Sequence, residues 1–161
     1  MKPLPPSLFR WVLLLALVVV VVDQGTKWWA VSALTGADPV RVIGDLIRLR
    51  LLYNPGAAFS IGTGFTWVLA VFAGVAVIAI AYVARRVRSR AWTVALGLLL
   101  GGAFTHLMDR LFRQPGFGRG HVVDFIDYAG FFVGNVADIA LVTGMALTLV
   151  LSLRGVRLAP E

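Results

Sequence analysis

The sequence predicts an all-α membrane protein, a bundle of four transmembrane helices with a small extracytoplasmic β-structure and loop. Composition is the first reason: 59% of the 161 residues are apolar, 14% are charged, and the mean hydropathy is +0.86. Soluble domains are about 45–50% apolar and about 25% charged. The other two reasons are four long apolar stretches and an uneven distribution of basic residues along the chain. The absence of cysteine excludes disulfides, thiolate metal sites and a cysteine nucleophile.

We expect a single integral membrane domain over residues 1–161, with spans at about 10–34, 65–84, 91–108 and 133–153. The second span carries no charged residue. Its length covers about 30 Å of hydrocarbon at about 1.5 Å per residue. The start of the first span also has the length of a signal-peptide core, but no small-residue cleavage motif follows and apolar residues resume. Because lipid offers the backbone no hydrogen-bond partners, we expect four helices packed as a bundle.

Basic residues indicate how the chain crosses the membrane. Eight of the 15 lie in the two tails and between the second and third spans: Lys2, Arg10, Arg85, Arg86, Arg88, Arg90, Arg154 and Arg157. These segments contain one acid, Glu161, and so carry a net +7, while the rest of the chain sums to zero. The positive-inside rule then places both termini in the cytoplasm and residues 35–64 and 109–132 outside. The net charge is a topology signal, and no nucleic-acid partner is expected.

The two outer segments contain short extended elements. Residues 47–51 alternate with a period of two, which indicates a strand, and Asn54-Pro55-Gly56 indicates a turn. Residues 113–120 contain three glycines and a proline, so we expect a loop. Residues 121–126 form either a short strand or an extended segment.

Ionisable residues within apolar spans are costly, so each is a candidate functional residue. Asp23 and Lys27 lie four positions apart on one helix face and can pair. The pair either has a structural role in orienting the first helix or contacts substrate. Asp109 and Arg110 are adjacent in sequence and point in different directions on a helix, so each should have another partner. A structural tie to a loop is the simpler interpretation of these two.

Two further aspartates lie towards the outer side in apolar surroundings. Asp138 lies about five residues inside the fourth span, roughly 8 Å below its outer boundary, and Asn135 precedes it by one turn. Asp124 is flanked by apolar residues, which is unusual for a solvated carboxylate. Asp127 follows three positions later and would point to the opposite face of an extended segment.

Other site chemistries can be eliminated. The chain has only two histidines, His106 and His121, and no zinc motif, so no metal is expected. Ser60 lies in no nucleophile elbow, and no nucleotide-binding glycine motif is present, so no cofactor is expected. What remains is paired-carboxylate chemistry, in which one aspartate activates water against an amide carbonyl and the other supplies a proton.

Five segments of the chain resemble motifs of the lipoprotein signal peptidases (signal peptidase II), and they occur in the family's order over about residues 20–150. They are Asp23-Gln24-Gly25-Thr26-Lys27, Asn54-Pro55-Gly56-Ala57-Ala58-Phe59-Ser60, Gly101-Gly102-Ala103 with Asp109-Arg110, His121-Val122-Val123-Asp124-Phe125, and Asn135-Val136-Ala137-Asp138.

This resemblance implies an aspartyl endopeptidase of the bacterial inner membrane. Such enzymes remove the signal peptide from diacylglyceryl-modified prolipoproteins and cut just before the lipidated cysteine. The resemblance makes Asp124 and Asp138 the catalytic pair, close to the outer leaflet. Residues that would support the site or contact substrate are Asp23, Lys27, Asn54, His106, Asp109, Arg110 and Asn135. The expected partners are prolipoproteins, membrane lipids and globomycin-type inhibitors. Because Asp138 lies deeper in the membrane by this interpretation, it is the better candidate for the protonated member.

The segment at about 40–62 and the loop near 113–120 are the counterparts of the family's extracytoplasmic β-structure and of the loop that closes over substrate. The chain departs from the family pattern in two places. Thr105-His106 replaces a Gly-Asn pair, and His106 either keeps the hydrogen bond of the amide or changes substrate contact and pH dependence. Gly134 replaces a frequent aromatic residue, which should open space or loosen the start of the fourth helix.

Two alternatives to an active lipoprotein signal peptidase are an inactive or divergent family member and a small membrane transporter subunit. A transporter predicts polar residues through the depth of several spans, and the second span has no charge.

Overall fold

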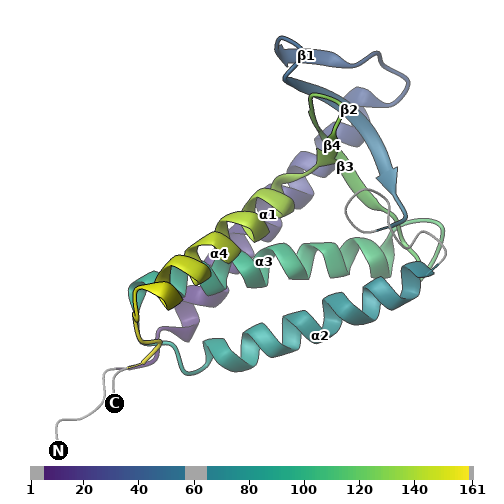
Figure 1. The fold of residues 1–161 in the computed structure, drawn as a ribbon. Coiled ribbons are helices and arrows are strands. Elements are labelled where there is room, and N and C mark those ends of the chain that lie inside the picture. The colour runs from purple at the N-terminus through teal and green to yellow at the C-terminus, as the bar shows by residue number, and fades with distance from the viewer. Residues whose placement is uncertain (1–5, 57–64, 160–161) are drawn as a thin grey trace, which may run out of the picture.

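A computed structural model describes residues 6–56 and 65–159. Within these ranges, four helices are long and apolar enough to cross a membrane: α1 (Phe9–Leu34), α2 (Thr66–Ala84), α3 (Arg90–Phe112) and α4 (Val136–Leu153). The helix α3 lies at the centre of the bundle and packs against α1, α2 and α4 (Figure 1). The prediction of a four-helix membrane bundle is confirmed.

A small antiparallel sheet lies beyond the end of α1 (Figure 1). Its strands follow the order β1 (Val40–Ile43), β2 (Ile47–Asn54), β3 (Val122–Tyr128) and β4 (Phe132–Gly134). The strand predicted at residues 47–51 is therefore confirmed as part of β2, and residues 121–126 mostly fall in β3. The sheet brings together two segments that lie far apart in the sequence and carry candidate site residues.

The two helix boundaries nearest the sheet differ from the predicted spans. The helix α3 continues to Phe112, so Asp109 and Arg110 lie inside its last turns. The helix α4 begins only at Val136, because residues 132–134 pair with β3 as a strand. The expectation that Asp138 lies about five residues inside the fourth span is therefore wrong, since it is the third residue of α4.

Glycines on α3 allow its backbone to approach both neighbours closely. A Cβ atom on Gly101 would lie 2.6 Å from Cβ of Val19 on α1, and one on Gly102 would lie 2.6 Å from Cγ of Leu141 on α4. Small residues favour such packing in membranes, where helix association depends on close van der Waals contact. The close packing holds the polar segments of α1, α3 and α4 side by side near the sheet.

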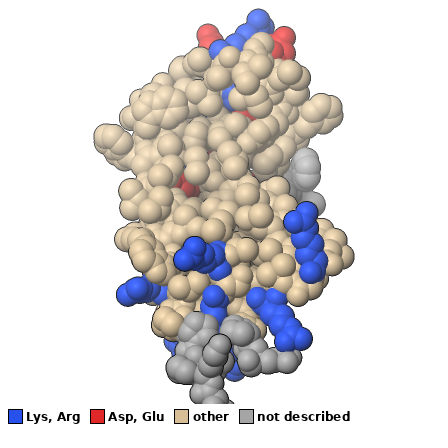
Figure 2. All heavy atoms as spheres, turned by 90° about the vertical axis from the view of Figure 1, so that its left-hand side faces the viewer, with Lys and Arg blue, Asp and Glu red and all other residues tan. Residues whose placement is uncertain are grey.

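Basic side chains collect at the end of the bundle opposite the sheet (Figure 2). The chain places seven described arginines at or near helix ends on that side: Arg10, Arg85, Arg86, Arg88, Arg90, Arg154 and Arg157. The start of α1 and the end of α4 lie at the same end (Figure 1). This is the arrangement from which the positive-inside rule predicts a cytoplasmic location for both termini.

Candidate active site

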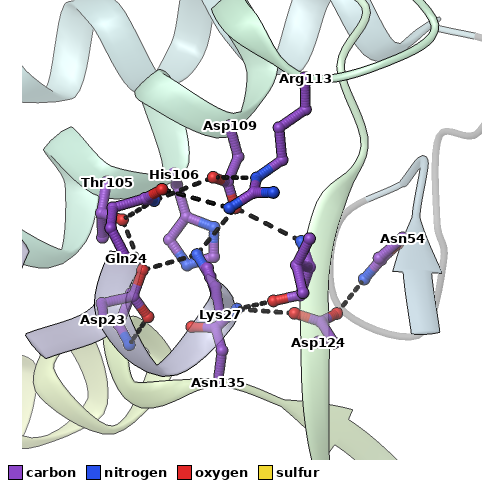
Figure 3. A network of polar contacts seen from close by, with 12 residues as sticks. Asp23, Gln24, Lys27, Asn54, Thr105, His106, Asp109, Arg113, Asp124 and Asn135 are labelled. Atoms are coloured by element: carbon purple, nitrogen blue, oxygen red, sulfur yellow. Dashed lines mark hydrogen bonds and ion pairs between the residues drawn. The ribbon is translucent and has the colours of Figure 1, made fainter. Parts of the chain in front are cut away.

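Asp124 lies in the middle of β3 and is only 2% exposed. Each of its carboxylate oxygens accepts a hydrogen bond from a side-chain amide: Asn54 Nδ2 donates to Oδ2 at 2.9 Å and Asn135 Nδ2 donates to Oδ1 at 2.6 Å (Figure 3). The pairing of β2 with β3 brings Asn54 alongside, because Leu52 lies opposite Asp124. The two neutral donors orient the carboxylate without neutralising its charge.

The environment of Asp124 favours its protonated form. Burial raises the pKa of Asp124 to about 6, and the nearby charge of Asp138 adds to the rise. The hydrogen bonds from Asn54 and Asn135 and the charge of a protonated His106 act in the opposite direction on this pKa. Desolvation therefore dominates at this carboxyl group.

Asp138 lies at the N-terminus of α4 in a capping box. The backbone N–H of Asp138 donates to Oδ1 of Asn135 at 3.1 Å, and the backbone N–H of Asn135 donates to Oδ2 of Asp138 at 2.9 Å. The other oxygen, Oδ1, lies 3.1 Å from Nε2 of His106. The side chain of Asp138 is 26% exposed. Asp124 is thus the more buried of the two carboxylates. The sequence makes Asp138 the better candidate for the protonated member because of its depth inside the fourth span, and this reason fails because α4 starts late and Asp138 lies near its end.

Both carboxylates line the same cavity, whose volume of about 80 Å³ leaves room for several water molecules. The other lining residues are Asn54, Gly56, His106, Arg110, Val122 and Phe132. Asn135 connects the two aspartates, because its amide nitrogen holds Asp124 while its amide oxygen caps the turn that contains Asp138. The cavity can thus hold water between two carboxyl groups in different environments.

A buried ionic cluster lies beside this pair. Lys27 Nζ is 2.7 Å from Oδ2 of Asp23 and 2.8 Å from Oδ2 of Asp109, and all three side chains are almost completely buried (Figure 3). Asp23 also accepts hydrogen bonds from Thr105 Oγ1 at 2.5 Å and from the backbone N–H of Ala137 at 2.8 Å. The predicted Asp23–Lys27 pair is confirmed, and it joins α1 to α3 and to the first turn of α4.

Asp109 links this cluster to the strand that carries Asp124. Its Oδ1 accepts from Arg113 Nε at 2.7 Å and from Gln24 Nε2 at 2.9 Å, and its Oδ2 accepts from the backbone N–H of Val123 at 3.3 Å. Sequence reasoning did not select Gln24, Thr105 or Arg113. The spacing of four between Asp109 and Arg113 was an available signal for one of them.

Arg110 has a separate set of partners, as predicted from its position next to Asp109. Its guanidinium donates to the carbonyl oxygens of Asn54 at 3.0 Å, Pro55 at 3.1 Å and Gly120 at 3.1 Å, and also to that of Gly56. It thereby joins the end of β2 to the loop before β3. The rest of the predicted motif after Gly56, including Phe59 and Ser60, lies outside the described residues.

The acid Asp127 belongs to a different part of the sheet. It is buried, but its partners are Arg48 at 3.2 Å, Arg50 at 3.4 Å and the backbone N–H of Gly130 at 2.7 Å. The alternation of β3 turns it away from the face that carries Asp124. Among the described residues, no three histidine, aspartate or glutamate side chains gather as a metal-binding group.

Both departures from the family pattern touch Asp138. His106 contacts its Oδ1, and a Cβ atom on Gly134 would lie 2.9 Å from its Oδ2 and 2.6 Å from Cε1 of Phe132. The space beside Gly134 is filled, and the capping box closes the start of α4. The expectation that Gly134 opens space is therefore wrong, and the alternative that it loosens the start of the fourth helix stays a prediction.

All nine residues selected from the sequence meet in one region at the sheet end of the bundle. Asp124, Asp138, Asn54, His106 and Arg110 line the cavity. Asn135 joins the two carboxylates. The remaining three, Asp23, Lys27 and Asp109, form the adjacent ionic cluster.

Comparison with known proteins agrees with this arrangement. The family model described as Signal peptidase (SPase) II matches residues 15–154. The chain is 46% identical to the lipoprotein signal peptidase of Mycobacterium tuberculosis (strain ATCC 25618 / H37Rv), over 95% of this chain and 76% of that protein. It is 48% identical to that of Leifsonia xyli subsp. xyli (strain CTCB07), over 89% of this chain and 67% of the relative. A solved structure described as a bacterial membrane enzyme matches with a TM-score of 0.79 and 27% identity, covering 95% of this chain and 93% of the other.

Proposed function

Because the chain belongs to the signal peptidase II family, we propose that it is an aspartic endopeptidase that removes the signal peptide from diacylglyceryl-modified prolipoproteins, just before the lipidated cysteine. The chain is a multi-pass bacterial membrane protein and a peptidase by its family and its four apolar helices. One observation carries the catalytic assignment: Asp124 and Asp138 face a common cavity and are held by the same asparagine.

The two environments assign different roles to the two carboxyl groups. Since burial raises the pKa of Asp124 to about 6, Asp124 holds the shared proton and donates a hydrogen bond to the scissile carbonyl oxygen. Asp138, which is more exposed, is the ionised member and removes a proton from water as it attacks the carbonyl carbon. The proton on Asp138 then passes to the leaving amine nitrogen as the carbon–nitrogen bond breaks.

The surrounding residues support this pair in the proposed enzyme. Asp23, Lys27 and Asp109 hold α1 and α3 together, and Asp109 also binds the backbone of Val123, the residue before Asp124 on β3. Arg110 holds the end of β2 and with it Asn54, which orients Asp124. These contacts give the ionic cluster and Arg110 a positioning role around the two aspartates.

An apolar groove beside Asp138 supports access from lipid. It is lined by Tyr128, Phe132, Asp138, Ile139, Val142 and Thr143. We propose that the signal helix of the substrate lies in lipid against the bundle and that its acylated cysteine enters along this groove.

The proposed topology has one membrane domain over residues 1–161, both termini in the cytoplasm and the active site near the outer leaflet. The collection of arginines at the end opposite the sheet supports this topology (Figure 2).

A transporter subunit is not favoured, because the charged residues of the described helices gather near the two ends of the bundle and α2 carries none. A gel-shift assay with a lipidated prolipoprotein distinguishes an active peptidase from an inactive family member, using membranes that contain the wild type, Asp124→Asn or Asp138→Asn. We expect the wild type to cleave and both variants to be inactive while they insert normally.

Asp45→Asn is a suitable control, because Asp45 is exposed in the turn between β1 and β2 and pairs only loosely with Arg41 at 3.3 Å. It should cleave like the wild type. The unlipidated precursor should not be cut, and globomycin should inhibit cleavage. Full activity of Asp138→Asn would contradict the catalytic assignment.

A further inference from the structure

We propose that His106 is a positioning residue that orients Asp138 and, through its charge, keeps Asp138 as the ionised member of the pair. The proposal rests on the proposed function, because it concerns the same two carboxylates. Its basis is the distance of 3.1 Å between Nε2 of His106 and Oδ1 of Asp138, inside the shared cavity.

The contact completes the fixation of the Asp138 carboxylate. Oδ2 accepts the backbone N–H of Asn135 in the capping box, and Oδ1 faces His106. A carboxylate bonded through both oxygens has lost its freedom to rotate, yet each oxygen keeps a second lone pair. The lone pair of Oδ1 that His106 does not use is available to a water molecule in the cavity.

The backbone that carries His106 is itself held in place. The preceding residue, Thr105, is buried and bonds to Asp23 at 2.5 Å and to Gln24 at 2.7 Å, both on α1. Close packing at Gly101 and Gly102 fixes α3 between α1 and α4. The imidazole therefore reaches Asp138 from a part of the bundle with little freedom to move.

The other charged and titratable groups around the pair come from α1, from α3 and the residue after it, from β3 and from α4. They are Asp23 and Lys27 on α1, Asp109 and Arg110 on α3, Arg113 directly after α3, Asp124 and Tyr128 on β3, and Asp138 on α4. Asp23, Lys27, Asp109 and Arg113 pair with one another and contribute no net charge. Arg110 donates to backbone carbonyls, and its charge acts on Asp124. A protonated His106 is thus the cation in direct contact with Asp138.

This charge has a defined consequence for the pH dependence of cleavage. Activity is lost in acid when the ionised member of the pair takes up a second proton. An imidazolium at 3.1 Å from Oδ1 opposes that protonation, so the wild type should stay active to lower pH than a variant without it. An amide in place of the imidazole donates a similar hydrogen bond but carries no charge.

The test measures kcat/KM against pH for the full-length protein in lipid nanodiscs, with a lipidated prolipoprotein as substrate. We expect His106→Asn and His106→Gln to move the acid limb of the profile up by about one pH unit, the lower end of the shift of about 1–3 units caused by an opposite charge within about 4–6 Å. The control is His121→Asn, which removes a histidine that does not line the cavity, and its profile should superimpose on that of the wild type.

The proposal would be overturned if the acid limbs of the pH profiles of His106→Asn and His106→Gln coincide with that of the wild type. Asp124→Asn and Asp138→Asn, assayed in parallel, separate this failure from failure of the proposed function, because they remain inactive if only the role of His106 is wrong. Titration of the His106 imidazole by NMR in the wild type and in Asp138→Asn covers the case in which His106 variants do not fold. The midpoint should fall in Asp138→Asn, and an unchanged midpoint would also overturn the proposal.

Discussion

The side chain of Asn135 donates a hydrogen bond of 2.6 Å to Asp124 through Nδ2. Through Oδ1 the same amide accepts the backbone N–H of Asp138 at 3.1 Å and so starts α4. One residue thus performs a structural task, the capping of a membrane helix, and also sets the relative position of two carboxyl groups. The two tasks can be separated by mutation.

Asn135→Ser should retain the helix cap and lose the contact with Asp124, because serine is an effective N-cap but too short to reach that carboxylate. Thermal stability in detergent should stay near that of the wild type while cleavage falls strongly. Asn135→Ala should lose both functions, with an additional loss of about 1 kcal/mol in the free energy of unfolding. Equal activity of the serine variant and the wild type would show that the Asp124 contact is dispensable.

Lys27→Met should be strongly destabilising. It removes the cation shared by Asp23 and Asp109 and leaves two buried carboxylates without their common partner. Breaking a buried ion pair from one side typically costs about 3–5 kcal/mol. The measurement is thermal unfolding of the purified protein. The double variant Lys27→Met with Asp109→Asn removes one of the two charges and should recover part of the loss. Failure of the double variant to recover any stability would contradict this explanation.

Gly134→Ala should lower kcat more than it lowers stability. The added Cβ would meet the ring of Phe132 and Oδ2 of Asp138, which the capping box holds. Relief of this contact displaces a carboxylate that must be accurately placed, and misplacement by about 1 Å can cost about 100-fold in rate. Phe132→Ala in the same chain frees space on one side and should restore part of kcat. Steady-state kinetics on the single and double variants distinguish this effect from unfolding.

The unfolding free energy should depend on pH through Asp124. Because burial raises the pKa of Asp124 to about 6, the folded state binds this proton more tightly than the unfolded chain, whose aspartates titrate near pH 4. The wild type should therefore become less stable relative to Asp124→Asn as the pH rises from about 4 to about 7, by about 2 kcal/mol, with little further change above that range. Unfolding of both proteins across this pH range provides the measurement. A constant difference would mean that Asp124 titrates as in the unfolded chain.

Local patterns in the sequence predict much of this fold. The uncharged stretch that forms α2 and the period-two alternation that begins β2 each depend on residues close together in the chain. The Asp23–Lys27 pair follows from a spacing of four on one helix. Residues 132–134 are apolar or glycine, and such a short segment has the same composition whether it starts a helix or forms a strand. The sequence therefore predicts the start of the fourth helix at residue 133, whereas α4 begins at Val136.

Three properties can be predicted from the amino-acid sequence alone: the four membrane helices, the asymmetry of charge between their ends and the identity of the polar residues among them. These properties follow from hydrophobicity and from interactions within a few residues. Three other properties depend on the tertiary fold: which carboxylate is the more buried, the second partner of Lys27, Asp109, which lies 82 positions away, and the contact of His106 with Asp138. Such contacts depend on how closely the helices approach and where the strands pair. Desolvation and long-range hydrogen bonding arise only once that packing exists.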